Sequence, residues 1–269
     1  MNKATGRVVL GFALLISPAA ARAEVDVTTS MKLIQLQILA PAGYSLMIFP
    51  GVLATASATA QDSLGGNVGQ SNTVPDGNTS ASAMTTLASA GATASAPSLA
   101  ATADSAVHIP QPVSASASSS ANGDPFGSLN GSFEIVGAMG PVSVTLTAML
   151  DYNQFLQTTG DGQSATSEVI FNLVLPDLDP NLNPILFFDN LFAIGPNDFK
   201  SQSGIPTLSN SVMLDANTPY SFIADVDAES SGLNVPEPSS WILSLTVFVL
   251  IALLFSRRER TRRAPTTAG

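Results

Sequence analysis

Apolar and polar residues alternate with a period of two along several stretches of this chain, and this pattern constrains the fold more than any other feature. In residues 142–150, apolar side chains fill every second position and hydroxyl side chains fill positions between them. Residues 220–227 repeat the pattern, with apolar side chains at Tyr220, Phe222, Ala224 and Val226. Successive side chains of a strand point to opposite faces of a sheet, so each stretch predicts a half-buried strand.

Several further segments carry a strand pattern and are bounded by Gly, Pro or Asn: 32–39, 44–49, 132–136, 168–175, 185–194 and 211–214. The first two predict a hairpin-like pair, in which Ile34, Leu36 and Ile38 share one face. We expect the last strand to end near Ala228, with residues 229–234 as a linker. Many short strands without a convincing amphipathic helix predict an all-β body, an antiparallel β-sandwich or jelly roll.

Residues 51–123 are dominated by Ala, Ser, Thr and Gly, and their local signals conflict. Alternation of Ala with Ser or Thr favours strands, whereas Ala-rich composition favours helix. Pro and Gly interrupt the segment too often for long helices, so we expect strands together with a flexible, low-complexity part. A strand face made only of Ala buries little area, so such strands are expected to pair only beside bulkier ones.

Charge and cysteine content exclude several classes of function. Eight of the ten basic residues lie near the two ends, and residues 24–234 hold two basic and eighteen acidic residues, a formal net charge of −16. Such a body repels phosphate backbones, so we predict no nucleic-acid partner. The chain has no cysteine, which excludes disulfides, thiolate nucleophiles and Cys-ligated metals.

Residues 1–23 have the three parts of a secretory signal peptide. Lys3 and Arg7 precede the apolar run 8–16, and small residues follow, with Ala21 and Ala23 in an A-x-A cleavage pattern. The Sec translocon and signal peptidase are therefore predicted partners, and Glu24 becomes the first mature residue. The alternatives are an uncleaved anchor, for which the apolar run is short, and an amphipathic helix.

The C-terminal segment predicts a marginal transmembrane helix. Val235, Pro236, Glu237 and Pro238 precede an apolar run that reaches membrane-spanning length over about 239–256. A basic tail over 257–263 follows, with arginines at Arg257, Arg258, Arg260, Arg262 and Arg263. Positive residues beside a span stay in the cytoplasm, so the body is predicted outside the inner membrane and the C-terminus inside.

The order of these elements, Pro-Glu-Pro, short apolar helix and Arg-rich tail, resembles the PEP-CTERM sorting signal of Gram-negative bacteria. The resemblance covers about residues 235–263. It implies that an exosortase, a membrane cysteine protease, cleaves at or near Pro236-Glu237-Pro238 and transfers the body to the cell surface or an exopolysaccharide matrix. The inner membrane then holds the chain only transiently. The alternative is a permanent C-terminal anchor with a chance Pro-Glu-Pro.

Few side chains qualify as candidates for catalysis or metal binding. His108 is the only histidine, so neither a His-based triad nor a His-based zinc site is expected. Asp177, Asp179 and Asn181 begin like a calcium loop, but the later positions depart from that pattern. Asp225, Asp227 and Glu229 would share one strand face, expected to be exposed. We predict no catalytic residue, metal or cofactor.

The sequence thus predicts three parts: a signal peptide (1–23), a β-rich extracellular body (24–230), and a linker with the sorting signal (231–269). The favoured function is a non-enzymatic structural or adhesive protein of the cell surface or biofilm matrix, with exopolysaccharide as a further partner. The alternative is a carbohydrate-binding or glycan-hydrolysing β-sandwich delivered by the same route.

Overall fold

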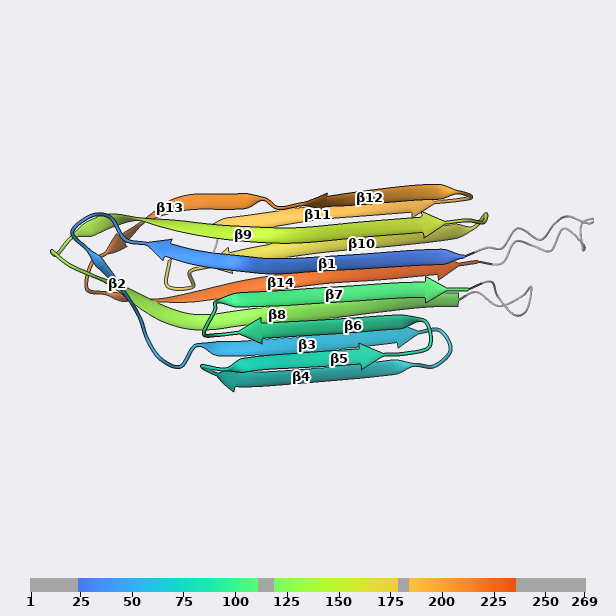
Figure 1. The fold of residues 1–269 in the computed structure, drawn as a ribbon, viewed down its shortest axis with the longest axis horizontal. Helices are drawn as coiled ribbons and strands as arrows, with labels where there is room; N and C mark the ends of the chain where they lie inside the picture. Colours follow the sequence, from blue (N-terminus) through green and yellow to red (C-terminus); the bar gives the residue numbers. More distant parts are fainter. Residues whose placement is uncertain (1–23, 111–118, 179–183, 236–269) are drawn as a thin grey trace, which may run out of the picture.

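The computed structural model describes residues 24–110, 119–178 and 184–235. Fourteen strands form two seven-stranded antiparallel sheets that lie face to face, with the strands running along the long axis of the body (Figure 1). The expectation of an all-β, sandwich-like body is confirmed. Throughout these ranges no helix is long and apolar enough to cross a bilayer. Both the signal peptide and the membrane helix of the sequence analysis lie outside the described residues.

Each sheet is built on long central strands. The first sheet has the order β12 (Asp198–Gly204), β9 (Pro141–Thr158), β1 (Val25–Leu39), β7 (Ala100–Ile109), β6 (Ala88–Ser95) and β5 (Asn78–Met84), and β13 (Thr207–Asp215) also pairs with β9. The second has the order β11 (Ile185–Ile194), β10 (Gln163–Val174), β14 (Pro219–Asn234), β8 (Ser119–Val136), β3 (Leu53–Asp62) and β4 (Asn67–Pro75), and β2 (Ser45–Ile48) also pairs with β8.

One half of the interior is filled by large side chains. Phe133, Phe171 and Phe222 are fully buried, and aliphatic residues of β1, β9 and β10 surround them. The apolar positions predicted in residues 142–150 and 220–227 face this core, which confirms both strands. Burying such side chains contributes about 25 cal/mol per Å² of apolar area, so this half supplies most of the hydrophobic stabilisation.

The other half of the interior is lined by small residues. Ala54, Ala56, Ala58 and Ala60 of β3 are fully buried, and alanines of β5 and β6 face them from the other sheet. A Cβ added to Gly123 of β8 would lie 2.6 Å from the Ser89 carbonyl oxygen of the opposite sheet, and one added to Gly127 would lie 3.0 Å from two more. The sheets therefore approach too closely here to admit even a methyl group at these glycines.

This close approach explains how the Ala-rich strands bury enough surface. Within its sheet the edge strand β5 pairs with β6 alone, and β6 consists of Ala, Gly, Ser and Thr, so the expectation that such strands pair only beside bulkier ones is wrong. The inward-facing alanines of β3, β5 and β6 are buried between the sheets, so close packing gives dispersion contacts in place of larger side chains.

A chain of buried hydroxyl groups crosses the interior between the two sheets. Ser105 Oγ on β7 donates to Ser230 Oγ on β14 at 2.7 Å, and Ser230 Oγ donates to Thr29 Oγ1 on β1, also at 2.7 Å. Thr29 Oγ1 shares a further bond of 2.6 Å with Ser167 Oγ on β10. Buried polar groups need such partners, so these four residues fix the position of one sheet against the other.

Side chains also join the edges of the two sheets. On one side, Lys200 Nζ donates to the Phe192 carbonyl at 2.5 Å, and Asn210 Nδ2 donates to the Pro184 carbonyl at 2.6 Å. On the other side, Asn72 Nδ2 of β4 donates to the Ser80 carbonyl of β5 at 2.6 Å. These bonds occupy main-chain groups of edge strands, which otherwise invite pairing with other chains.

The structure differs from the sequence-based predictions in one strand pairing, one side-chain orientation and one strand boundary. Residues 32–39 and 44–49 do not form a hairpin, because β1 lies in the first sheet and β2 pairs with β8 in the second. Ile34 is exposed while Leu36 and Ile38 are buried, because a β-bulge between Leu33 and Gln35 changes the phase of the alternation. The last strand continues to Asn234 rather than ending near Ala228.

Candidate functional site

Most residues of the predicted processing sites lie outside the described residues. These are Ala21 and Ala23 of the signal cleavage site, Pro236, Glu237 and Pro238 of the sorting motif, and the membrane-orienting Arg257, Arg258, Arg260, Arg262 and Arg263. Val235, the first residue of the motif, is described and exposed, directly after β14. The structure therefore describes the body up to the edge of each predicted cleavage site.

Glu24 and Val235, which border these sites, are held by the same tight turn between β9 and β10. The Thr159 amide donates to the Glu24 carbonyl at 3.1 Å, and the Val235 amide donates to the Gly162 carbonyl at 3.3 Å. The Glu24 amide also donates to Thr159 Oγ1 at 2.7 Å. In Figure 1 β1 begins and β14 ends at the same end of the sandwich. Both predicted cleavage sites thus border one end of the body.

An acidic patch lies on the outward face of the second sheet. Asp225, Asp227 and Glu229 alternate along β14 and share this face, as expected, but they are half-buried rather than fully exposed. Strand register brings Glu168 of β10 opposite Glu229, and places Asp124 of β8 on its other side. We call these five residues the acidic patch.

Asp227 has the most perturbed pKa of the patch. Burial, together with the negative charges of Asp124 and Glu229, raises the pKa of Asp227 to about 7. The physical cause of the burial is the register, since Asp227 lies between Ile170 of β10 and Phe126 of β8. These apolar neighbours remove water from the carboxylate and disfavour its charged form.

The negative charges of the other carboxylates in the acidic patch are only partly offset by hydrogen-bond donors. Ser128 Oγ donates to Asp225 Oδ1 at 2.7 Å, yet burial still raises the pKa of Asp225. Burial also raises the pKa of Glu229, and nearby Asp124 and Glu168 add to this effect. Both lysines among the described residues, Lys32 and Lys200, lie on strands of the other sheet. The patch is therefore a concentrated negative surface without a cationic partner from this part of the chain.

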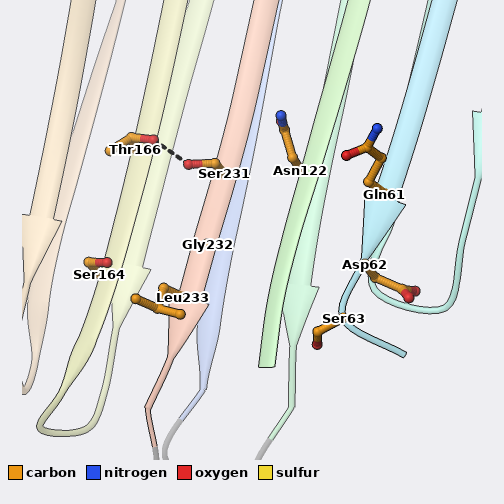
Figure 2. Close-up of a pocket in the computed structure, with 9 residues that line it drawn as sticks. All are labelled: Gln61, Asp62, Ser63, Asn122, Ser164, Thr166, Ser231, Gly232 and Leu233. Atoms are coloured by element: carbon orange, nitrogen blue, oxygen red, sulfur yellow. Dashed lines mark hydrogen bonds between the residues drawn. The ribbon is translucent and has the colours of Figure 1, made fainter. Parts of the chain in front are cut away.

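An open groove of about 440 Å³ adjoins the patch at the end of the second sheet. Figure 2 shows its lining on four adjacent strands, with amide, carboxyl and hydroxyl side chains at Gln61, Asp62, Ser63, Asn122, Ser164, Thr166 and Ser231. Thr166 Oγ1 and Ser231 Oγ share a hydrogen bond of 2.6 Å across the groove floor. Such a lining offers several hydrogen-bonding groups, and Gly232 and Leu233 add apolar area to it.

The calcium-loop candidate is described only in part. Asp177 Oδ2 accepts a hydrogen bond of 2.5 Å from the Ser221 amide, which links the end of β10 to β14. Asp179 and Asn181 lie outside the described residues. The contact seen for Asp177 is structural, because it holds a main-chain donor.

His108 lies beside two carboxylates that the sequence analysis did not connect with it. His108 Nδ1 is 2.5 Å from Asp26 Oδ1 and 3.5 Å from Glu24 Oε1. Asp26 is directly opposite His108 in the β1–β7 pairing. Asp26 and His108 are 82 residues apart in the sequence, so only the long-range register of β1 with β7 could have shown the cluster.

Comparisons with protein-family models, curated proteins and solved structures find no significant match for this chain.

Proposed function

We propose that this chain is an exported protein of the cell surface or extracellular matrix, with a structural or adhesive role and no catalytic activity. In this proposal a signal peptide directs export, and the C-terminal segment is a PEP-CTERM sorting signal that an exosortase removes. In the same proposal the β-sandwich has a jelly-roll-like connection of its strands, and the inner membrane anchors the chain only transiently.

The observation that carries the proposal is the position of the body between the two predicted cleavage sites. All fourteen strands that the structure describes lie between Glu24 and Val235, so neither cut would remove any of them. The chain also leaves β14 at the same end of the sandwich at which β1 begins. A body tethered through Val235 would project its long axis away from the membrane. Because prolines disfavour helix, Pro236 and Pro238 would keep the motif accessible to a protease.

The surface chemistry supports a location among cations and neutral glycans. The acidic patch and the net charge of −16 over residues 24–234 disfavour contact with anionic polymers. The body needs no disulfide, since its two cores and the hydroxyl chain hold the sheets together. Edge strands whose main-chain groups are occupied by side chains also suit a protein that must remain folded outside the cell.

Sorting can be tested by replacing both prolines of the motif, Pro236→Ala and Pro238→Ala, in the host cell. We expect the variant to accumulate in the inner membrane with its basic tail, whereas the unaltered chain reaches the surface or the medium without it. Pro265→Ala is the matched control, because it makes the same change beyond the basic tail. Equal processing of the double variant would argue against recognition of the motif.

The groove suggests how the body contacts a matrix polysaccharide. Its amide and hydroxyl groups can hydrogen-bond to sugar hydroxyls, although aromatic stacking surfaces do not line it. Ser231→Trp would fill the groove, and we expect retention on the host exopolysaccharide to fall roughly tenfold. Ser221→Trp is the control, since Ser221 faces the same side of β14 outside the groove. Equal retention of both variants would exclude the groove as the contact.

A further inference from the structure

We propose that Glu24, Asp26 and His108 form a binding site for a divalent transition cation of the Zn²⁺ type. One nitrogen and two carboxylate oxygens from these side chains lie within 4.8 Å of one another. Among the residues that the structure describes, no other three acidic or histidine side chains meet this criterion. All three side chains lie in the body that both predicted cuts would leave, and the site needs no matrix partner, so it goes beyond the proposed function.

The backbone that carries the three side chains is well fixed. Asp26 and His108 are cross-strand neighbours in the β1–β7 pairing, and the His108 amide donates to the Leu87 carbonyl at 2.9 Å. Glu24 is held at both its amide and its carbonyl by Thr159. The backbone is already ordered before a cation binds, so binding costs little backbone entropy. Such preorganisation favours affinity.

The side chains can reach the spacing that a metal requires. The His108 Nδ1 to Asp26 Oδ1 distance of 2.5 Å is that of a hydrogen bond, so a cation would displace the shared proton and separate the two atoms. Ligand distances around zinc are about 2.0–2.2 Å for nitrogen and oxygen donors. The three side chains are between one third and three fifths exposed, which leaves room for this adjustment.

The donor set selects the class of cation. Imidazole nitrogen with carboxylate oxygen suits Zn²⁺ and its neighbours in the transition series, whereas Ca²⁺ prefers six or more oxygen ligands. Three protein ligands leave at least one position of a tetrahedral site open to water or to a donor from another molecule. The acidic patch differs from this site, because it offers oxygen alone and its carboxylates are spread along the sheet.

The test uses the full chain, purified in mild detergent without a histidine tag, and titrated with Zn²⁺ by calorimetry. His108 is the only histidine, so its ring signals in an NMR spectrum report the site without ambiguity. We expect saturable binding at one site, a shift of the imidazole signals on adding Zn²⁺, and little displacement of Zn²⁺ by excess Ca²⁺.

Variants distinguish a metal site from a simple hydrogen-bonded pair. His108→Ala and Asp26→Asn should each weaken Zn²⁺ binding at least about tenfold, while Asp151→Asn, an exposed acid on neighbouring β9, should leave it unchanged. Circular dichroism checks that each variant retains its strands. Imidazole signals that do not respond to saturating Zn²⁺, or equal binding by the His108→Ala variant, would overturn the proposal.

Discussion

Glu24 and Val235, the first and last residues of the described sequence, are both hydrogen-bonded to the turn that joins β9 and β10. Thr159 binds the first at 3.1 Å and Gly162 binds the second at 3.3 Å. One turn therefore organises the borders of both predicted cleavage sites. Every strand that the structure describes lies between these two residues, so neither predicted cut would remove a described strand.

The glycines of β8 should be intolerant of any side chain. Gly123→Ala would place a methyl group 2.6 Å from the Ser89 carbonyl oxygen, and overpacking of this kind destabilises by about 1–3 kcal/mol. Urea denaturation of the body, residues 24–235, measures the change. Gly91→Ala is the control, because its Cβ would meet nothing within 4 Å, and it should be neutral or stabilise by up to about 1 kcal/mol. Equal stability of both variants would contradict the close approach of the sheets.

The buried hydroxyl chain should contribute measurably to stability. Ser230→Ala leaves Ser105 Oγ without its acceptor and Thr29 Oγ1 without one donor. Loss of a buried hydrogen-bond partner costs about 1–3 kcal/mol, and a lower denaturation midpoint should report it. Ser82→Ala, at an exposed position of β5, should change the free energy of unfolding by less than about 0.5 kcal/mol. A Ser230→Ala variant as stable as the parent would show that the chain is not needed.

Asp227 should make the body less stable as pH rises. Its folded-state pKa is raised to about 7, so the folded state binds a proton more tightly than the unfolded state, whose pKa is about 3.9. Both states are protonated below about pH 4, and stability is then lost progressively up to about pH 7. Asp227→Asn should remove this loss and raise the free energy of unfolding at pH 8 by about 1–3 kcal/mol.

Denaturation curves at pH 4 and pH 8 measure the effect of Asp227→Asn. The gain should appear at pH 8 and vanish near pH 4, where the carboxyl is already neutral. Asp215→Asn, an exposed acid at the end of β13, should show the same small effect at both pH values. If Asp227→Asn raises the free energy of unfolding at pH 8 no more than the control does, the charge of Asp227 does not destabilise the folded state.

Strands with bulky alternating residues could be predicted from the sequence, because one side of each must be buried. Residues 185–194 form β11 with the predicted bounds, and the apolar face of residues 220–227 is buried as expected. The local sequence pattern gave wrong predictions where pairing with a distant strand determines the orientation of a side chain or the partner of a strand. The bulge near Ile34 and the separation of β1 from β2 follow from pairings with distant strands.

The candidate sites, like the strands, were predictable only where the local sequence determines them. Alternation alone places Asp225, Asp227 and Glu229 on one face, but only the register of β14 with β8 and β10 adds Asp124 and Glu168. The neighbours of His108 in its cluster, Glu24 and Asp26, lie more than 80 residues earlier in the chain, so its local sequence does not contain them. The Ala-rich strands could not be placed with certainty, because their stability depends on how closely the opposite sheet approaches.

The intact mass of the exported protein tests the central claim most directly. We predict a species that begins at Glu24, ends within the Val235 to Pro238 motif, and therefore lacks both the signal peptide and the arginine tail. Recovery of a surface protein that still carries residues 257–263 would contradict the account, as would a chain found only in the cytoplasm with its first 23 residues attached.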